Sequence, residues 1–118
     1  MRYMVMHYED EATEAGTPPS PEVIAAVGQY MAEAGQSGVL LAAEGVRPST
    51  FGARITVEGG KVEVKDGPFA EAKELIAGFA ILDVRSKDEA IEHATRFARI
   101  VGATKVDVRL VSELNDFE

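Results

Sequence analysis

Three segments of this chain are apolar at successive positions, without the polar alternation of a strand that lies on a single core. They are Arg2 to Tyr8, "GVLLAAEG" from Gly38 to Gly45, and "LIAGFAILDV" from Leu75 to Val84. Side chains of a strand point alternately to the two faces of a sheet. These segments therefore predict strands with two apolar faces, both of which have to be covered.

Two other segments predict helices. In the first, Ser20 is a favourable N-cap, and apolar residues recur at helical spacing to about Gly35. In the second, Ser86 and Glu89 predict a capping box, and an apolar stripe continues until Gly102.

The remaining segments complete the pattern. Residues 53–58 and 61–65 alternate between apolar and polar around Gly59 and Gly60, which predicts a two-residue hairpin with one solvated face. The acidic and Pro-rich residues 9–20 predict a mobile surface loop. Residues 105–111 predict a last strand.

The order of elements is β-α-β, a β-hairpin, and β-α-β again. This order predicts an α+β, ferredoxin-like sandwich with both helices on one sheet face, formed by residues 1–118 as a single domain. Two helices cover one face only. We therefore expect a homodimer in which the free sheet faces of two copies pack together.

The composition and net charge exclude several classes of partner and of chemistry. The 12 Lys and Arg are scattered among 20 Asp and Glu, and the net charge of −8 argues against nucleic acid and against anionic membrane surfaces as partners. The chain has no Cys, which excludes disulfides and a cysteine nucleophile. With no apolar run near the ~20 residues of a membrane span and no signal-peptide pattern, a cytoplasmic location is expected.

Several motifs resemble those of a known family. "GVLLAAEG", "GAR", "DGPFAEAKELIAGF" and "SKDEAIE" are similar to the YCII-related proteins of the DGPF type, and the likeness covers about Met1 to Arg99. The resemblance implies a dimeric α+β barrel, an architecture that also occurs in muconolactone isomerases and cofactor-free monooxygenases. Many DGPF-type proteins are encoded beside extracytoplasmic-function sigma factors, which implies a regulatory protein partner.

One feature of the YCII branch is missing. There, a His on the first helix faces an Asp near the second strand, but residues 22–35 contain no His and residues 39–43 contain no Asp. This acid-base pair cannot be carried over to the chain.

Two residues remain as candidates for catalysis. His7 is suited to acid-base work because its ordinary pKa lies near neutrality, although a lone His on a strand is more often structural. Asp66 begins the "DGPF" turn and is either an Asx-type turn residue or a carboxylate at a pocket rim.

Other polar residues could hold a ligand. Glu44, Lys73 and Glu74 end or precede apolar strands and could form a polar cluster at one end of the sheet, although Lys73 and Glu74 could equally be a solvated pair. Three residues could add donors for an anionic ligand: Arg47, Ser49 and Arg54.

No nucleotide-binding glycine motif or recognised metal spacing is present, so no cofactor or metal is expected. The sequence favours a homodimer that binds a small ligand or acts in regulation. The alternative is a cofactor-independent enzyme for a small substrate, either neutral or anionic, with His7 or Asp66 as the base. A purely structural dimer module is a third possibility.

Overall fold

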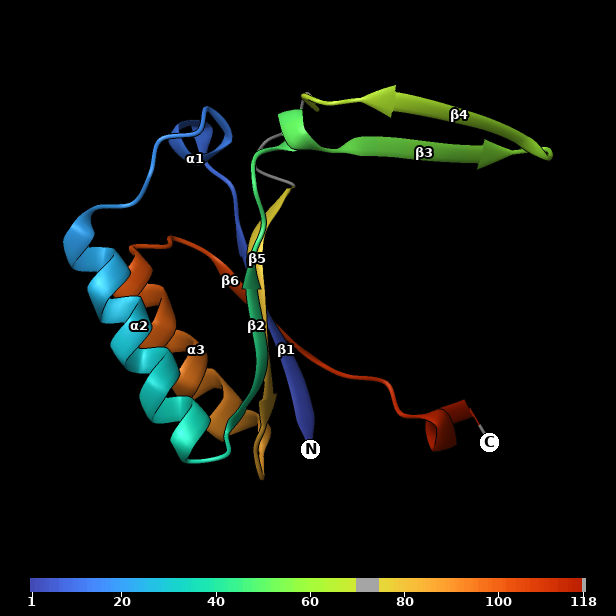
Figure 1. The fold of residues 1–118 in the computed structure, drawn as a ribbon. Helices are drawn as coiled ribbons and strands as arrows, with labels where there is room; N and C mark the ends of the chain where they lie inside the picture. The colour runs from blue at the N-terminus through green and yellow to red at the C-terminus, as the bar shows by residue number, and fades with distance from the viewer. Residues whose placement is uncertain (70–74, 118) are drawn as a thin grey trace.

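The structure is a computed structural model that describes residues 1–69 and 75–117 (Figure 1). A four-stranded sheet carries two long helices on one face, and a two-stranded hairpin lies apart from it. The strands are β1 (Arg2–Tyr8), β2 (Leu40–Gly45), β3 (Ala53–Glu58), β4 (Lys61–Asp66), β5 (Ile76–Asp83) and β6 (Val106–Leu110). The helical elements are α1 (Glu11–Glu14), α2 (Pro21–Gln36), η1 (Ser49–Phe51), α3 (Lys87–Val101) and η3 (Leu114–Phe117).

The order of strands in the main sheet is β2-β5-β1-β6, and all neighbouring strands are antiparallel. β1 lies between β5 and β6, the two strands that precede and follow α3 in the sequence. This arrangement confirms the predicted ferredoxin-like α+β fold, with the hairpin inserted between β2 and β5.

The core lies between the sheet and α3. Tyr3 and Val5 of β1 and Leu82 of β5 pack there, and Leu82 is only 2% exposed. Ala90 and Ala94 of α3 are also buried in this cluster. Their small side chains allow α3 to approach the strands closely. Within the described residues, no helix is long and apolar enough to cross a membrane.

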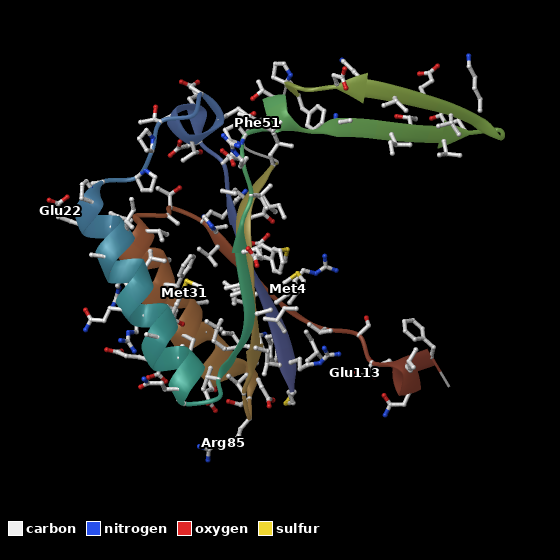
Figure 2. The ribbon with its side chains drawn as sticks, viewed as in Figure 1. Met4, Glu22, Met31, Phe51, Arg85 and Glu113 are labelled. Carbon is white, nitrogen blue, oxygen red and sulfur yellow. The ribbon has the colours of Figure 1, made fainter. Side chains whose placement is uncertain are left out.

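The other face of the sheet is apolar, and no helix from residues 1–69 or 75–117 lies on it (Figure 1). Because Tyr3 and Val5 point to the core, Met4 and Met6 point to the opposite face. Their partners in the register are Ile81 and Phe79. Figure 2 shows Met4 on the side of the sheet away from α2.

The hairpin is confirmed, but its expected burial on one face is not found within one chain. The register pairs Ile55 with Val64 and Val57 with Val62, so these four side chains share one face of the hairpin. Each of them is at least 60% exposed. The hairpin projects from the end of the sheet toward the side that the helices leave open (Figure 1).

Residues 11–14 form one turn of helix where the sequence predicted only a loop. Asp10 is the N-cap: its Oδ1 accepts a hydrogen bond of 2.8 Å from the backbone N–H of Thr13. In return, the Asp10 N–H donates to the Thr13 hydroxyl at 2.8 Å. The two bonds satisfy backbone groups at the end of the helix, so a single turn is stable in an acidic, Pro-rich segment.

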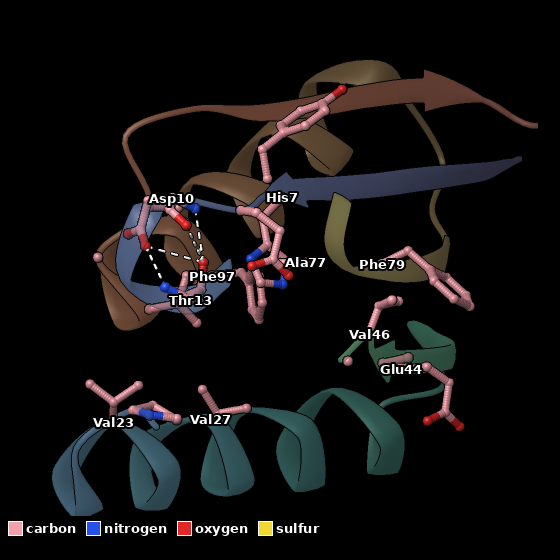
Figure 3. Close-up of a pocket in the computed structure, with 18 of the residues that line it drawn as sticks. His7, Asp10, Thr13, Val23, Val27, Glu44, Val46, Ala77, Phe79 and Phe97 are labelled. Carbon is pink, nitrogen blue, oxygen red and sulfur yellow. Dashed lines mark hydrogen bonds between the residues drawn. The ribbon is translucent and has the colours of Figure 1, made fainter. Parts of the chain in front are cut away.

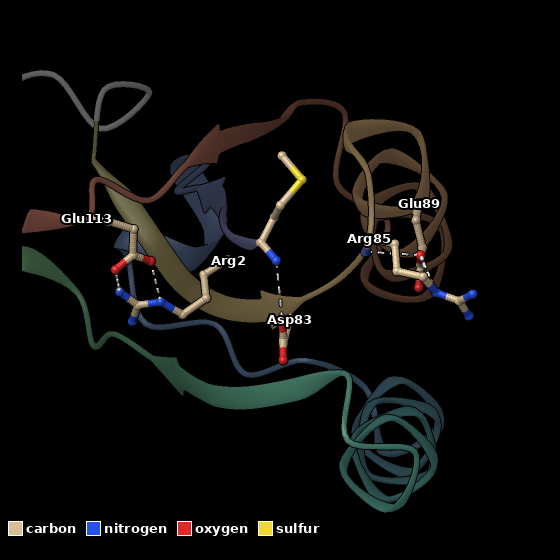
Figure 4. Close-up of polar contacts among 6 residues, drawn as sticks. Arg2, Asp83, Arg85, Glu89 and Glu113 are labelled. Carbon is tan, nitrogen blue, oxygen red and sulfur yellow. Dashed lines mark hydrogen bonds and ion pairs between the residues drawn. The ribbon is translucent and has the colours of Figure 1, made fainter. Parts of the chain in front are cut away.

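The start of α3 differs in one detail from the predicted capping box. Ser86 accepts from the Glu89 N–H as expected, at 3.1 Å. The Glu89 carboxylate, however, accepts from the N–H of Arg85, one residue before the N-cap, at 3.2 Å. Figure 4 shows this contact beside two ion pairs of the chain ends.

The C-terminal segment is tied to β1 by one forked ion pair. Arg2 donates from Nε and from one terminal nitrogen to the two carboxylate oxygens of Glu113, at 2.9 and 3.0 Å (Figure 4). The terminal ammonium of Met1 lies 3.5 Å from Asp83. Both pairs are exposed, so they orient the chain ends more than they stabilise the fold.

Gly67 of the "DGPF" turn is fixed by close packing. A Cβ at this position would lie 1.7 Å from the carbonyl oxygen of Ser49 in η1. The Gly67 N–H also donates to the Gly52 carbonyl at 3.0 Å. Gly67 does not have a positive φ, so space rather than backbone conformation requires glycine here.

We expect Gly67→Ala to lower the free energy of unfolding by about 2 kcal/mol or more, because η1 or the turn would have to move. Gly28→Ala in α2 is the matched control, since its Cβ meets nothing within 4 Å. That control should raise the free energy of unfolding by about 0.5–1 kcal/mol through helix propensity. Chemical denaturation measures both, and equal stability of the two variants would contradict the close approach.

Candidate functional site

A cleft of about 1290 Å³ lies between α2 and the helix-facing side of the sheet. It forms because only the second half of α2 packs closely: Tyr30 and Ala34 are buried. In the first half, Val23 and Val27 are partly exposed and line the cleft. Figure 3 shows these two valines on one side of the cleft, across from His7.

His7 lies on the wall formed by β1, in phase with Tyr3 and Val5. Its ring packs against Phe97 of α3 with 5.3 Å between centroids, in an edge-to-face arrangement. Gly78 is its partner on β5, and a Cβ on Gly78 would lie 2.6 Å from His7 Nε2. Glycine on β5 therefore leaves the space that the imidazole occupies. Burial lowers the pKa of His7 below its ordinary value, which favours the neutral ring.

Glu9 lies two residues further along the chain and also lines the cleft. It is 6% exposed, and its N–H donates to the Leu75 carbonyl at 2.7 Å. Its Oε2 is buried and has no hydrogen-bond partner among the described residues. Such an atom is unusual, because a buried carboxylate oxygen without a donor is costly.

Ser49 joins three segments at the end of the cleft. Its N–H and its hydroxyl both donate to Glu14 Oε1, at 2.6 and 2.5 Å, and its hydroxyl accepts from the Phe69 N–H at 3.0 Å. Ser49, a predicted ligand-binding residue, thus connects α1, η1 and the "DGPF" turn. The second oxygen of Glu14 is buried and without a partner in the described part of the chain.

Both arginines named as anion ligands lie over aromatic rings. The Arg47 guanidinium is 3.8 Å from the centroid of Phe51, and that of Arg54 is 4.4 Å from Phe69. Arg47 lines the cleft, whereas Arg54 lies on β3, outside it.

The structure does not gather the other sequence-predicted site residues in one place. Asp66 is exposed at the end of β4 and does not line the cleft. Glu44 lies at the cleft edge, but it pairs with Phe79, so its side chain belongs to the open face of the sheet. Lys73 and Glu74 are outside the described residues. Of the predicted set, His7 and Arg47 therefore lie in the cleft, and Glu44 only borders it.

Three cleft residues were missed as site residues. Tyr30 and Phe97 lie within the two apolar helical patterns described from the sequence, and their rings, 6.2 Å apart, form part of the cleft wall. Glu9 was predicted only as part of the surface loop of residues 9–20. Its position in phase with His7, directly after an apolar strand, was the available signal for a buried acid.

The described residues contain no group of three or more His, Asp or Glu side chains placed to hold a metal ion. The cleft offers aromatic and aliphatic walls and several polar groups, which are the carboxylates of Glu9, Asp10 and Glu14, the guanidinium of Arg47 and the imidazoles of His7 and His93.

The pKa of His7 gives a pH test. It lies below the ordinary value of about 6.5 in the folded protein, so below that pH the unfolded chain binds more protons. The free energy of unfolding should therefore fall as the pH is lowered from about 6.5 toward the folded pKa. An NMR titration of the His7 ring should show a midpoint below 6.5, and His7→Gln should flatten this part of the stability curve. A midpoint at or above 6.5 would contradict the burial of the ring.

Comparison with known proteins places the chain in a family. The family model of the YCII-related domain matches residues 1–113. The uncharacterized protein R00369 of Rhizobium meliloti (strain 1021) is 36% identical over 99 residues, which cover 80% of this chain and 77% of that protein.

A solved structure has a similar fold. It is the 5-chloro-2-hydroxyhydroquinone dehydrochlorinase TftG of Burkholderia phenoliruptrix AC1100, in complex with 2,5-dihydroxybenzoquinone. The TM-score is 0.55 over 98% of each chain, at 12% identity, which is a likeness of fold alone. On the family match over nearly its whole length, the chain belongs to the family of YCII-related domain proteins.

Proposed function

We propose that the protein binds a small, largely apolar organic molecule in the cleft between α2 and the sheet. The observation that carries this proposal is the cleft itself, about 1290 Å³ in volume, with aliphatic and aromatic walls and a few polar groups. Ligand sites of proteins are typically concave and apolar, with a small number of placed polar groups that orient the ligand.

The aromatic side chains favour a ring compound. His7 packs edge-on against Phe97, and Phe97 lies 6.2 Å from Tyr30. Rings of this kind offer flat and edge surfaces for an aromatic or alicyclic ligand. The related fold of TftG binds a single-ring compound, 2,5-dihydroxybenzoquinone, which supports a ligand of that size. Its chemistry is not carried over to this chain.

Binding has more support than catalysis. A general base is normally oriented by a hydrogen bond to its second nitrogen, and the hydrogen bonds of the described residues include none to His7. Asp66, the other proposed base, lies outside the cleft. An acid-base enzyme is the second candidate, favoured by the neutral form of His7, which is the form that accepts a proton.

The same sheet supports a second proposal, that two copies form a homodimer. Met4, Met6, Phe79 and Ile81 form an apolar face that no helix covers (Figure 1). The apolar strip of the hairpin, defined above as Ile55, Val57, Val62 and Val64, lies toward that side. A second copy offers the same apolar surface in return, which makes a symmetric pair the economical cover.

Val27→Trp tests the cleft, because an indole in place of Val27 would fill it. A set of single-ring fragments should shift NMR signals of Val23, Val27 and Phe97 in the wild type, and Val27→Trp should abolish binding. Ala25→Trp on the exposed side of α2 is the control and should bind normally. Following the spectra over a day also reports turnover, and a binding protein should leave the fragment unchanged. Shifts outside the cleft, or binding that survives Val27→Trp, would refute the proposal.

Light scattering coupled to gel filtration tests the homodimer. The wild type at micromolar concentration should have twice the 12.7 kDa mass of one chain. The double variant Val57→Lys, Val62→Lys places two charges in the apolar strip and should shift the mass toward one chain. Thr56→Lys, on the opposite face of the hairpin, should remain dimeric. A wild-type monomer would rule out the dimer.

A further inference from the structure

We propose that the ligand of the cleft is a small organic cation, an amine with an apolar body, and that Glu9 pairs with its ammonium group. The proposal rests on the proposed function, since it names the chemical class of the ligand for the same cleft.

Glu9 is the first reason. The residue is 94% buried, since its exposed fraction is 6%, and its Oε2 has no hydrogen-bond donor among the described residues. Burying a carboxylate without a donor costs several kcal/mol in general. In the proposed complex, the head group of the ligand supplies the donor that the described residues do not. A ligand in the cleft is placed to do so, because Glu9 lines it.

The charge at this end of the cleft is the second reason. Asp10 and Glu14 line the cleft beside Glu9, and Glu14 Oε2 is also buried without a partner in the described residues. Hydrogen bonds from Thr13 lower the pKa of Asp10, so this residue keeps its negative charge. Arg47 is the only Lys or Arg among the described residues that line the cleft, and its guanidinium lies over Phe51. The neutral form of His7 adds no positive charge.

These features rank three kinds of ligand head group. A carboxylate would be repelled by the acidic groups and would leave Glu9 Oε2 without a donor. A neutral hydroxyl would donate one hydrogen bond to the carboxylate, but it would leave the local negative charge uncompensated. An ammonium would donate a hydrogen bond between two ionised groups, and its charge would offset the local negative charge. Its apolar body would lie against Phe97 and Tyr30.

Three compounds of matched shape test this ranking: benzylamine, benzyl alcohol and benzoate. Calorimetry at pH 7, with NMR shifts at Val27 and Phe97 to locate the site, should show the amine bound about tenfold more tightly than the alcohol. Benzoate should be the weakest. In Glu9→Gln, the preference for the amine over the alcohol should fall at least about threefold, and what remains comes from Asp10 and Glu14. Glu22→Gln is the control, because it removes the same charge from an exposed residue of α2 that does not line the cleft.

Each other outcome has a definite meaning. Alcohol or benzoate binding in the cleft as tightly as the amine would overturn the cation proposal and leave the binding function standing. An amine preference of unchanged size in Glu9→Gln would overturn the role of Glu9. If none of the three compounds shifts the cleft signals, while fragments of the broader set do, the head-group proposal fails alone. If no fragment binds, both proposals fail.

Discussion

The two apolar faces of the four-stranded sheet are the constraint on which the structure depends. On one face, Tyr3, Val5 and Leu82 pack against the alanines of α3. On the other, Met4 and Met6 lie beside Phe79 and Ile81, and neither long helix of the described residues lies on them. A strand that is apolar on both sides buries its side chains under the helices on one face of the sheet. On the other face, its apolar side chains need a partner to cover them. The exposed hairpin has the same origin, because its apolar strip finds no cover within one chain.

The cleft exists because α2 packs unevenly against the sheet. α3 lies close to the strands through Ala90 and Ala94, whereas α2 is buried mainly at Tyr30 and Ala34. The chain closes the far end of the cleft with a junction of backbone and side-chain hydrogen bonds at Ser49, which connects Glu14 of α1 to the Phe69 N–H. The described residues of the "DGPF" turn therefore have a structural role. Position 67 requires glycine because the Ser49 backbone lies directly against it.

The sequence was sufficient for the order of elements and the fold, because those depend on local periodicity and capping. It was insufficient for α1, whose single turn depends on the reciprocal bonds of Asp10 and Thr13. The site was harder to predict, since it depends on which side chains far apart in the chain converge. His7 was identified from its residue type and its phase on β1. Ser49 and Arg54 were assigned to a ligand from their donors alone, and their actual partners are Glu14 and Phe69. Glu9 was not predicted as a site residue, because its burial depends on three-dimensional packing.

The uneven packing of α2 has a consequence for how the molecule opens. Regions with few buried contacts open locally at a lower free energy than the core. The first half of α2, around Val23 and Val27, is only partly buried, while Tyr30 and Ala34 anchor the second half. Amide hydrogen exchange should therefore be graded along this one helix, fast at its start and slow near Tyr30. A ligand could enter when the first turns of α2 fray briefly, while α3 stays packed on the sheet. The rate of entry would then depend on the local opening of α2 and not on the global stability of the fold.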